Sequence, residues 1–519
     1  MFDVSRLSAE QRRVVLAGDG PLLVVAGPGS GKTMTLAARI AYLVAARGVT
    51  PAAVLAITFT TAAAHTLRRR LYAMLGDPGG AVDVTTFHAL GLRIVRHWSD
   101  VLGFHGPPIV YGAAATWALL RQAAATVGVD LEHRPLRALA TEVEHYRMGS
   151  TTTGSSRDGA GQPDGLRTLA EAYESLLLRG NGVDYPAMLT LPLRAFAAHP
   201  PALQMCQDAY RAIMADEFQD LSGAEYALLR LLGQRHRNIA VVGDPKQSLY
   251  AWRGASIRLF DDFLADFPDA QVLVLEQNFR STGRLVALAN SLGMALGYPR
   301  GLWTENPPGQ EALLYAAADE EDEASFVAAE ITRLTTAGAV DHLGEIAILY
   351  RTNTQATAVT AALSARALPS VLLSSDEDNA HTRPWGDHAS PPAAATGDRV
   401  VLTTIHASKG GEWRVVFVVG VEDGLLPHAC ALLKHPPHLH AAAPAAAEAV
   451  TAAAVAPASP TGAASLAEEL RIAYVAVTRP RERLYLTYCR TRRRGAWRQP
   501  RSPSRFIRVL PDALVRDVP

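Results

Sequence analysis

The chain has 519 residues, with 50 basic and 50 acidic side chains and a formal net charge of zero. Its 49% hydrophobic and 19% charged residues exclude a disordered protein, and its length allows three or four domains. No stretch reaches the ~18 apolar residues of a membrane span, and MFDVSRLSAEQ has no secretory signal pattern. We therefore expect a cytoplasmic protein that does not bind membranes. With zero net charge, any nucleic-acid surface must be local.

Arginine carries almost all of the basic charge, because only four residues are lysines: Lys32, Lys246, Lys409 and Lys434. A lysine ammonium is a compact point charge, whereas an arginine guanidinium is a planar fork. A lysine that persists in this composition should therefore mark a place where the two cannot be exchanged. Three of the four lie in the motifs described below, whereas Lys434 lies in a low-complexity segment.

The first motif is an apolar run, Leu22 to Ala26, followed by GPGSGKT and a helical-looking segment. This order of strand, phosphate loop and helix is typical of nucleotide sites, because backbone N–H groups at the helix N-terminus can surround phosphate oxygens. Lys32 then reaches the outer phosphates, and the Thr33 hydroxyl can bind Mg²⁺. Ala26 replaces the first glycine of the strict pattern, so the match is to a relaxed form. A plain glycine-rich turn is the alternative.

Two flanking segments carry polar groups that suit a nucleotide or a nucleic acid. Upstream, Ser8 and Gln11 have capping-box spacing, so Gln11 either caps a helix or reads an adenine edge. Downstream, we expect strands at Val54 to Thr58 and at Val84 to His88. At their ends, Phe59 and His88 suit a phosphate and base track, although ordinary strand caps would look the same.

From about Leu90 to Gln207 the pattern is helical, interrupted at Ser150 to Gly165 by a segment with the composition of a flexible, exposed loop. Strand character resumes at Ala212 to Ala215, which indicates a helical domain inserted in an α/β domain. Asp216 and Glu217 follow that strand. Two carboxylates at such a strand end can hold Mg²⁺ and orient or deprotonate an attacking water.

The next predicted strand, Ile239 to Gly243, directs Gln247 toward the phosphates. Tyr250, Trp252 and Arg253 then place aromatic faces and a cation within four residues, which suits stacking of single-stranded bases at about 1 to 3 kcal/mol per base. The alternative is that the two rings pack in the core, but the surrounding turn residues favour exposure.

Another strand is expected at Val272 to Leu275. A second α/β set then starts at Glu345 to Tyr350, and its further strands, expected to be parallel and covered on both faces, follow the apolar runs Val400 to Thr404, Val415 to Gly420 and Leu484 to Tyr488. Asp319 to Glu323 should begin a helix, whose dipole favours acids in its first turn. A metal site from His435, His438 and His440 is an alternative to simple disorder in their segment, but no acid or cysteine completes it.

Arginines near strand ends in both halves suggest a nucleotide at the interface between two domains. Closing that cleft would bring Arg280 and Arg479 onto the γ-phosphate. Further along, the arginines at 490 and 492–494 form a basic tail, which either assists phosphate binding or is simply a soluble end.

Taken in order, the motifs resemble those of the UvrD/Rep/PcrA-like branch of superfamily 1 DNA helicases. The resemblance runs from residue 7 to 490 and is carried by SAEQRRVV, AGPGSGKT, TFTTAAA, TTFHALGLRIV, DEFQD, VVGDPKQSLYAWRGA, LEQNFRS, LTTIHASKGGEW and LRIAYVAVTRPRERLYLT. It implies an α/β fold with two RecA-like parallel-sheet P-loop NTPase motor domains and one helical insertion domain. It also implies an ATP-driven motor that steps 3′ to 5′ along single-stranded DNA.

The resemblance implies roles for individual residues. Gln11 would read adenine, Phe279 would stack on it where the family usually has Tyr, and Glu412 would hold the ribose. Asp216 would hold Mg²⁺ through water, and Glu217 would be the catalytic base. Gln247, Arg280 and Arg479 would sense and stabilise the γ-phosphate. The expected nucleotide-binding loop is Ala26, Gly27, Pro28, Gly29, Ser30, Gly31, Lys32, Thr33 and Met34, and the expected DNA contacts are Phe59, His88, Tyr250, Trp252, Arg253 and His406.

The chain also departs from the family pattern. Met34 replaces an arginine that commonly stacks on adenine, and Thr61 and Ala62 replace a polar Asn-Lys pair. GDPKQ resembles the RecB/AddA branch. Between EIAILYRTN and TTIH, only the sparse segment Ser374 to Gly397 stands where the family has a second accessory subdomain of well over a hundred residues. We therefore expect a pared-down motor with weak or unregulated duplex unwinding.

The expected domains are residues 1–90 with 208–274, residues 91–207, and residues 275–373 with 398–519, with a linker at 374–397 and a low-complexity insertion at 429–467. The expected function is an ATP- and Mg²⁺-dependent 3′ to 5′ DNA helicase in repair, recombination or replication restart. Its partners would be single-stranded DNA, 3′-tailed duplex DNA and a DNA-repair protein, and it would be monomeric. The alternatives are an ATP-switched single-stranded DNA binding or recruitment module, and a small-molecule phosphotransferase.

Overall fold

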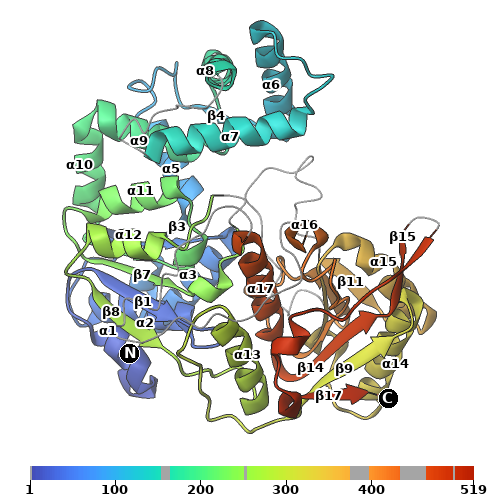
Figure 1. Ribbon diagram of the computed structural model, residues 1–519. Helices are drawn as coiled ribbons and strands as arrows, with labels where there is room; N and C mark the ends of the chain where they lie inside the picture. The colour runs from blue at the N-terminus through green and yellow to red at the C-terminus, as the bar shows by residue number, and fades with distance from the viewer. Residues whose placement is uncertain are drawn as a thin grey trace.

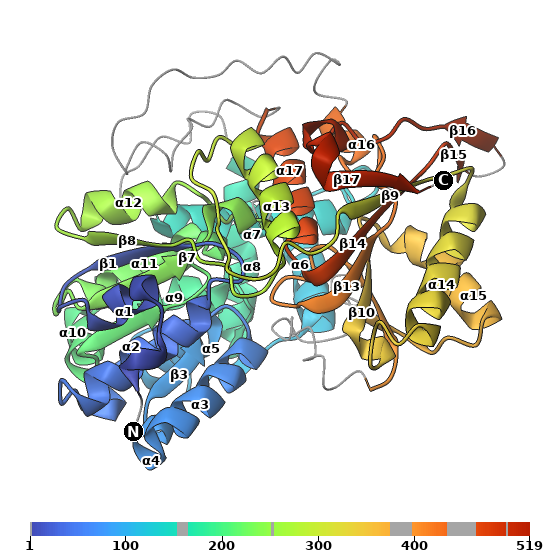
Figure 2. The same ribbon diagram turned by 90° about the horizontal axis from the view of Figure 1, so that it is seen from below.

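Two large parallel sheets stand side by side in the computed structural model, which describes residues 3–152, 164–250, 254–373, 397–432, 463–494 and 497–518 (Figure 1). Three helices project above the first sheet in that view: α6 (Ala113–Val127), α7 (Leu136–Thr152) and α8 (Asp164–Arg179). The view from below shows the same side-by-side arrangement of the two halves (Figure 2). The expected α/β class with two RecA-like sheets is confirmed.

The first sheet has six parallel strands in the order β3-β2-β6-β7-β1-β8. They are β1 (Leu22–Ala26), β2 (Val54–Thr58), β3 (Asp83–Thr86), β6 (Ala212–Ala215), β7 (Ile239–Gly243) and β8 (Gln271–Leu275). The strand predicted at 84–88 is wrong at its end, because the Thr86 side chain caps helix α5 (Phe87–His97) by accepting a hydrogen bond from the backbone N–H of Ala89. His88 therefore lies in the first turn of a helix.

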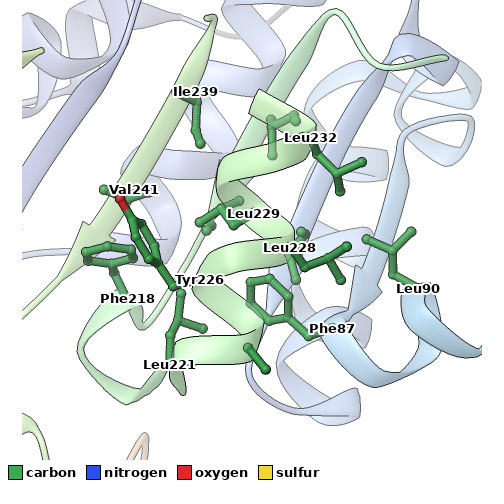
Figure 3. Close-up of a cluster of buried hydrophobic side chains, with 14 of the residues drawn as sticks. Phe87, Leu90, Phe218, Leu221, Tyr226, Leu228, Leu229, Leu232, Ile239 and Val241 are labelled. Atoms are coloured by element: carbon green, nitrogen blue, oxygen red, sulfur yellow. The ribbon is translucent and has the colours of Figure 1, made fainter. Parts of the chain in front are cut away.

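Alternate residues of these strands enter two different cores, as the period of a strand requires. Leu22 and Val24 of β1 pack with the helices on one face, whereas Leu23 packs with those on the other. The first set is α1 (Ala9–Leu16), α2 (Lys32–Ala45) and α3 (Thr61–Leu75), next to the short α4 (Asp77–Gly80). The second set is α5, α9 (Ala187–Ala198), α10 (Pro200–Ala209), α11 (Gly223–Gly233) and α12 (Leu259–Asp266). Figure 3 shows this second core around α11.

Residues 91–207 divide between two cores. Helices α5, α9 and α10 contribute side chains to the core of the first sheet, whereas α6, α7 and α8 form a separate cluster of their own. The short parallel strands β4 (Ile109–Val110) and β5 (Gly182–Val183) lie at the base of that cluster. Here the buried Arg147 guanidinium donates two hydrogen bonds to the Asp184 carboxylate, at 2.6 and 3.1 Å. Most of the expected loop at 150–165 lies outside the described residues.

The second sheet has seven parallel strands in the order β11-β12-β10-β13-β14-β9-β17. They are β9 (Ala312–Ala317), β10 (Ile346–Tyr350), β11 (Ser370–Leu373), β12 (Val400–Thr404), β13 (Trp413–Val418), β14 (Pro480–Cys489) and β17 (Val515–Val518). One face is covered by α13 (Gly283–Ala295) and α17 (Ala463–Val477), and the other by α14 (Glu320–Thr336) and α15 (Ala356–Ala365). The helix predicted from the acidic run at 319–323 is confirmed, with Asp319 as its N-cap. No helix in the described ranges is long and apolar enough to cross a membrane.

Most of the two sparse segments of this half lies outside the described residues, at 374–396 and at 433–462 with His435, His438 and His440. The ends of the second segment are helical, in α16 (Ala429–Leu432) and at the start of α17.

The arginines after β14 do not form a tail. They belong to an antiparallel hairpin of β15 (Thr491–Arg494) and β16 (Trp497–Pro500), which extends from the second sheet (Figure 2). The Arg492 guanidinium donates hydrogen bonds to two buried carboxylates, those of Glu422 at 2.7 Å and Glu323 at 2.6 Å. Because a buried carboxylate needs a cationic or hydrogen-bonding partner, Arg492 has an internal role that neither interpretation of these arginines anticipated.

Helix α1 is attached to the phosphate-loop helix α2 by one buried arginine. The Arg39 guanidinium is fully buried and donates to the carbonyl oxygens of Val14, Ala17 and Gly18 at 2.9 to 3.0 Å. These carbonyls lie at the C-terminal end of α1, where a positive charge also complements the helix dipole. Burial lowers the pKa of Arg39 to about 10, so it remains charged at neutral pH.

We predict that Arg39→Met lowers the free energy of unfolding by roughly 3 kcal/mol, because it leaves buried carbonyls without donors. Urea denaturation monitored by circular dichroism measures this change. Arg47→Met is the matched control, because the Arg47 side chain is 45% exposed and pairs with Asp19 at the surface, where a salt bridge contributes less than about 1 kcal/mol. Equal losses in the two variants would contradict the role given to Arg39.

Candidate functional site

The phosphate loop connects β1 to α2 and has the backbone that its glycines permit. Gly29 and Gly31 have φ values of 70° and 78°, a region that side chains rarely adopt. The Lys32 ammonium lies inside the loop, where it donates to the carbonyl oxygens of Ala26 at 3.2 Å and Gly27 at 3.1 Å. Burial lowers the pKa of Lys32, although the nearby carboxylates of Glu217 and Asp244 oppose the shift. The predicted loop and its lysine are therefore in place to receive phosphate oxygens.

Two carboxylates from β6 face this loop. The Thr33 hydroxyl donates a 2.8 Å hydrogen bond to Oδ2 of Asp216, across 183 residues of sequence. Burial and the adjacent Glu217 charge raise the pKa of Asp216 to about 6. Burial alone would also raise the pKa of Glu217, but Lys409 and Lys32 hold it below its ordinary value. Of the two carboxylates, Glu217 therefore keeps its charge to lower pH, which suits a general base.

Thr33 and Asp216 place two oxygen donors side by side, a set that suits Mg²⁺. In nucleotide sites Mg²⁺ takes one or two protein ligands and completes its shell with phosphate and water. Within the described ranges, no group of three or more His, Cys, Asp or Glu residues could hold a metal.

Glu217 has an unusual backbone and a dedicated partner. Its φ of 54° places a residue other than glycine in the left-handed region, a conformation that costs about 1 kcal/mol or more. The Gln219 amide donates to the Glu217 carboxylate, and its oxygen accepts a 2.9 Å hydrogen bond from the backbone N–H of Asp244. A Cβ on Gly243 would lie 2.6 Å from that same amide oxygen, so the glycine makes room for it. Sequence reasoning missed Gln219, because only the fold brings β6 and β7 together.

Lys409 crosses from the second half to the first. Its ammonium donates to the Asp220 carboxylate and, at 2.8 Å, to the backbone carbonyl of Gln247. It also lies 5.4 Å from the centroid of the Tyr250 ring. Burial raises the pKa of Asp220 to about 7, against the effect of Lys409. One cation thus contacts the segment that bears Glu217, the segment that bears Gln247, and an aromatic ring.

Lys246 forms a second contact between the halves. Its ammonium lies 5.7 and 5.6 Å from the ring centroids of Tyr298 and Tyr474, close enough for cation–π attraction. Next to it, the Gln247 side chain is buried, and its amide donates to Asp244 at 2.7 Å. Gln247 therefore lies at the site, as predicted, but its amide is bonded to a carboxylate.

The two predicted arginines lie close to each other and to the charged groups of this site, because the charge of Arg280 acts on the pKa of Lys32 and the charge of Glu217 acts on the pKa of Arg479. Arg280 donates to Glu412 at 2.6 Å and to the Thr478 carbonyl at 3.1 Å. Glu412 also accepts from Arg481, and although burial opposes it, the charge of Arg280 helps to hold the pKa of Glu412 below its ordinary value. Arg479 is buried, and burial together with the charge of Arg280 lowers its pKa to about 9.

The base side of the loop carries exposed apolar groups. Phe279, Met34 and Trp303 are 48%, 43% and 43% exposed, which is high for such large side chains. The Gln11 amide completes the predicted capping box with Ser8 and also donates a 3.0 Å hydrogen bond to the Ser30 carbonyl on the loop. The capping box is therefore confirmed and Gln11 also contacts the phosphate loop, whereas its contact with an adenine edge stays a prediction.

Three of the predicted DNA residues lie in two stacked aromatic pairs of the first half. Phe59 stacks on Tyr250 with ring centroids 5.3 Å apart, and His88 stacks on Tyr185 at 3.5 Å. Tyr250 is 9% exposed, so the prediction of an exposed ring is wrong, because Phe59 and Lys409 cover it. The stacking partner of His88, Tyr185, was not among the residues singled out in the sequence.

Of the remaining predicted DNA residues, His406 lies within the described part of the chain. Burial, Arg351 and Lys409 lower the pKa of His406 to about 3, so this imidazole is neutral at physiological pH. Trp252 and Arg253 lie outside the described residues.

Family models match most of the chain. Residues 7–268 match the UvrD/REP helicase N-terminal domain, and residues 273–377 and 389–491 match the UvrD-like helicase C-terminal domain. The chain is 34% identical over 382 residues to the ATP-dependent DNA helicase UvrD1 of Mycobacterium tuberculosis, covering 71% of this chain and 48% of that protein. It is 33% identical over 356 residues to the ATP-dependent DNA helicase PcrA of Staphylococcus epidermidis, covering 68% and 49%. The chain thus spans about half the length of the curated relatives it matches.

We predict that Lys409→Met makes stability depend on pH above 7. The substitution leaves the Asp220 carboxylate buried without its cation, so the pKa of Asp220 should rise beyond its present value of about 7. The folded variant then takes up a proton as the pH falls from 8 to 7, whereas Asp220 in the unfolded chain, with a pKa of about 3.9, stays ionised. The free energy of unfolding should therefore increase toward lower pH, by up to about 1.4 kcal/mol per unit.

Urea denaturation of the wild type and the variant at pH 6, 7 and 8 checks this. In the wild type, the part of the pH dependence of the free energy of unfolding that is due to Asp220 should be confined to pH values below about 7. The double variant Asp220→Asn/Lys409→Met should lose the dependence, since neither titrating group remains. A double variant as pH-dependent as Lys409→Met would show that another group is responsible.

Proposed function

The chain belongs to the UvrD/REP helicase family, and from this membership we propose that it is an ATP-dependent DNA helicase that moves 3′ to 5′ on single-stranded DNA. The observation that carries the proposal is that a phosphate loop and two carboxylates of the first half lie close to Arg280 and Arg479. Arg280 is bonded to the carbonyl of Thr478, the residue next to Arg479, and Glu217 and Arg479 are near enough to interact electrostatically. A nucleotide bound there touches both halves, so its hydrolysis can change how they lie relative to each other.

In this proposal the first half binds and hydrolyses ATP. Lys32 exchanges the carbonyls of Ala26 and Gly27 for phosphate oxygens, and Thr33 with Asp216 holds Mg²⁺. When bound, Mg²⁺ neutralises charge on the phosphates. The ionised Glu217, fixed by Gln219, orients and deprotonates the attacking water. Arg280, Arg479 and Gln247 stabilise the γ-phosphate, and Gln11, Met34, Phe279 and Glu412 contact the base and ribose.

In the same proposal, Lys409 couples DNA binding to ATP hydrolysis. A base that stacks among Phe59, Tyr250, His88 or His406 would shift the ring that lies over this ammonium. Because Lys409 is bonded to Asp220 and to the Gln247 carbonyl, that shift reaches the hydrolytic residues directly. We also place Tyr185, Trp252 and Arg253 on the DNA path.

We place the first motor domain in residues 1–90 and 208–275 and the second in 276–373 and 398–519, one residue from the expected boundary at 274, because strand β8 of the first sheet ends at Leu275. Helices α6, α7 and α8 then form the inserted unit. Residues 374–399 alone separate β11 from β12, which leaves no room for a large second accessory domain at that point. This favours one alternative, an ATP-switched module that binds single-stranded DNA or recruits a repair protein and unwinds little.

We predict that single-stranded DNA stimulates ATP turnover at least tenfold, and that Lys32→Ala and Glu217→Gln abolish the stimulated rate. A strand-displacement assay should show unwinding of a 3′-tailed duplex and not of a 5′-tailed one. If the DNA affinity changes with ATP but neither unwinding nor translocation occurs, the result would favour the ATP-switched binding module over the motor. DNA-independent turnover that phosphorylates a small acceptor would contradict both.

A further inference from the structure

The segment that carries Arg280 crosses from the first sheet to the second, between β8 and α13, and lies against the phosphate loop. Asn278 is its central residue. This side chain is 3% exposed, and its amide nitrogen donates a 2.8 Å hydrogen bond to the carbonyl oxygen of Pro28 in the loop. Its amide oxygen accepts hydrogen bonds from the backbone N–H groups of Arg280 at 2.9 Å and Ser281 at 2.7 Å. One end of the amide faces a carbonyl and the other faces two N–H groups, so these partners define its orientation.

The backbone around Asn278 is bonded just as completely. The N–H of Asn278 donates to the Trp303 carbonyl at 2.7 Å, and the Asn278 carbonyl accepts from the Thr304 hydroxyl at 2.6 Å. The next N–H, that of Phe279, donates to the Gly29 carbonyl at 2.9 Å. Two consecutive residues of the crossing segment are thus bonded to two consecutive residues of the phosphate loop.

Gly29 shows how close the two segments are. A Cβ on Gly29 would lie 2.6 Å from the amide nitrogen of Asn278 and 2.8 Å from Cβ of Arg280, both too short for real contacts. A residue other than glycine at this position would also be strained at its φ of 70°. The loop therefore needs glycine here for a second reason, because Arg280 lies directly against it.

Arg479 is attached differently. Its guanidinium donates to Val475, Gly411 and Thr478, at 2.9 to 3.1 Å, and all three belong to the second half. The backbone of Arg280 is bonded through Asn278 to the loop of the first half, and only its side chain reaches Glu412 and the Thr478 carbonyl of the second half.

We propose that Asn278 is a positioning residue that fixes the Arg280 backbone to the phosphate loop, so that Arg280 remains with the nucleotide while Arg479 arrives and leaves with the second half. The inference rests on the proposed function, in which both arginines act on the γ-phosphate. Arg280 then needs only a side-chain rotation away from Glu412 to reach the phosphate. Asn278 keeps the backbone of Arg280 in place during that rotation.

The test is a double-mutant cycle on the full chain, with Asn278→Ala, Arg280→Ala and the double variant. Steady-state ATP turnover with single-stranded DNA should fall about tenfold or more in each single variant. The double variant should be no slower than Arg280→Ala, because Asn278 acts through Arg280. The affinity for a fluorescent ADP, which has no γ-phosphate, should change less than about threefold in Asn278→Ala.

Two further variants separate positioning from folding. Asn278→Asp keeps the acceptor for Arg280 and Ser281 but loses the donor to Pro28, so it should show the same loss of turnover. Asn290→Ala is the matched control. The Asn290 amide nitrogen donates a hydrogen bond to the carbonyl of Leu302, and its amide oxygen accepts one from the backbone N–H of the same residue. Leu302 lies against Gly27 of the phosphate loop, and this contact does not involve Arg280. The melting temperature of Asn290→Ala should fall by as much as that of Asn278→Ala, whereas its ATP turnover should stay within about twofold of the wild type.

The positioning role would be overturned if the double variant lost turnover by the product of the two single losses, those of Asn278→Ala and Arg280→Ala. It would also be overturned if Asn290→Ala lost as much turnover as Asn278→Ala. Either result would leave the helicase proposal in place. Wild-type turnover in Arg280→Ala would overturn the assignment of Arg280 itself, and with it this inference.

Discussion

A buried ammonium, that of Lys409, spans the boundary between the two sheets, and the arrangement of the site depends on it. An unpaired charge at such a place would cost several kcal/mol, so Asp220 and the Gln247 carbonyl must stay within reach of it. Both acceptors belong to the first half, next to Glu217. The requirement to pair this one charge therefore keeps the second half in register with the hydrolytic residues of the first.

The same requirement favours a lysine at position 409 in a chain so rich in arginine. The Lys409 ammonium fits between one carboxylate, one carbonyl and the Tyr250 ring. A guanidinium would bring five donors in a fixed plane, most of which would find no acceptor in this space. Arg39, with three carbonyl acceptors around it, shows the surroundings in which a buried arginine is favourable instead.

Local sequence was sufficient for most strands of the two sheets and insufficient for the contacts between elements. Apolar β-branched runs such as Val54–Thr58 and Val400–Thr404 matched their strands residue for residue, because buried parallel strands are apolar on both faces. β9 (Ala312–Ala317) was missed because its alanines have low strand propensity, and β17 because its Val-Arg-Asp-Val sequence has the charges of an exposed edge. The motif residues were recognisable by order and spacing. Gln219, Tyr185 and the role of Asn278 were not, because each depends on contacts with residues distant in the sequence.

The central claim is that the two halves of the chain form a single nucleotide site, and one measurement tests it most directly. A crystal structure with Mg²⁺, single-stranded DNA and a non-hydrolysable ATP analogue should place the γ-phosphate within hydrogen-bond distance of Lys32 and of Arg479, with Arg280 released from Glu412. A nucleotide held by the first half alone, with Arg479 still bonded to Val475 and Gly411 and Arg280 still paired with Glu412, would contradict it.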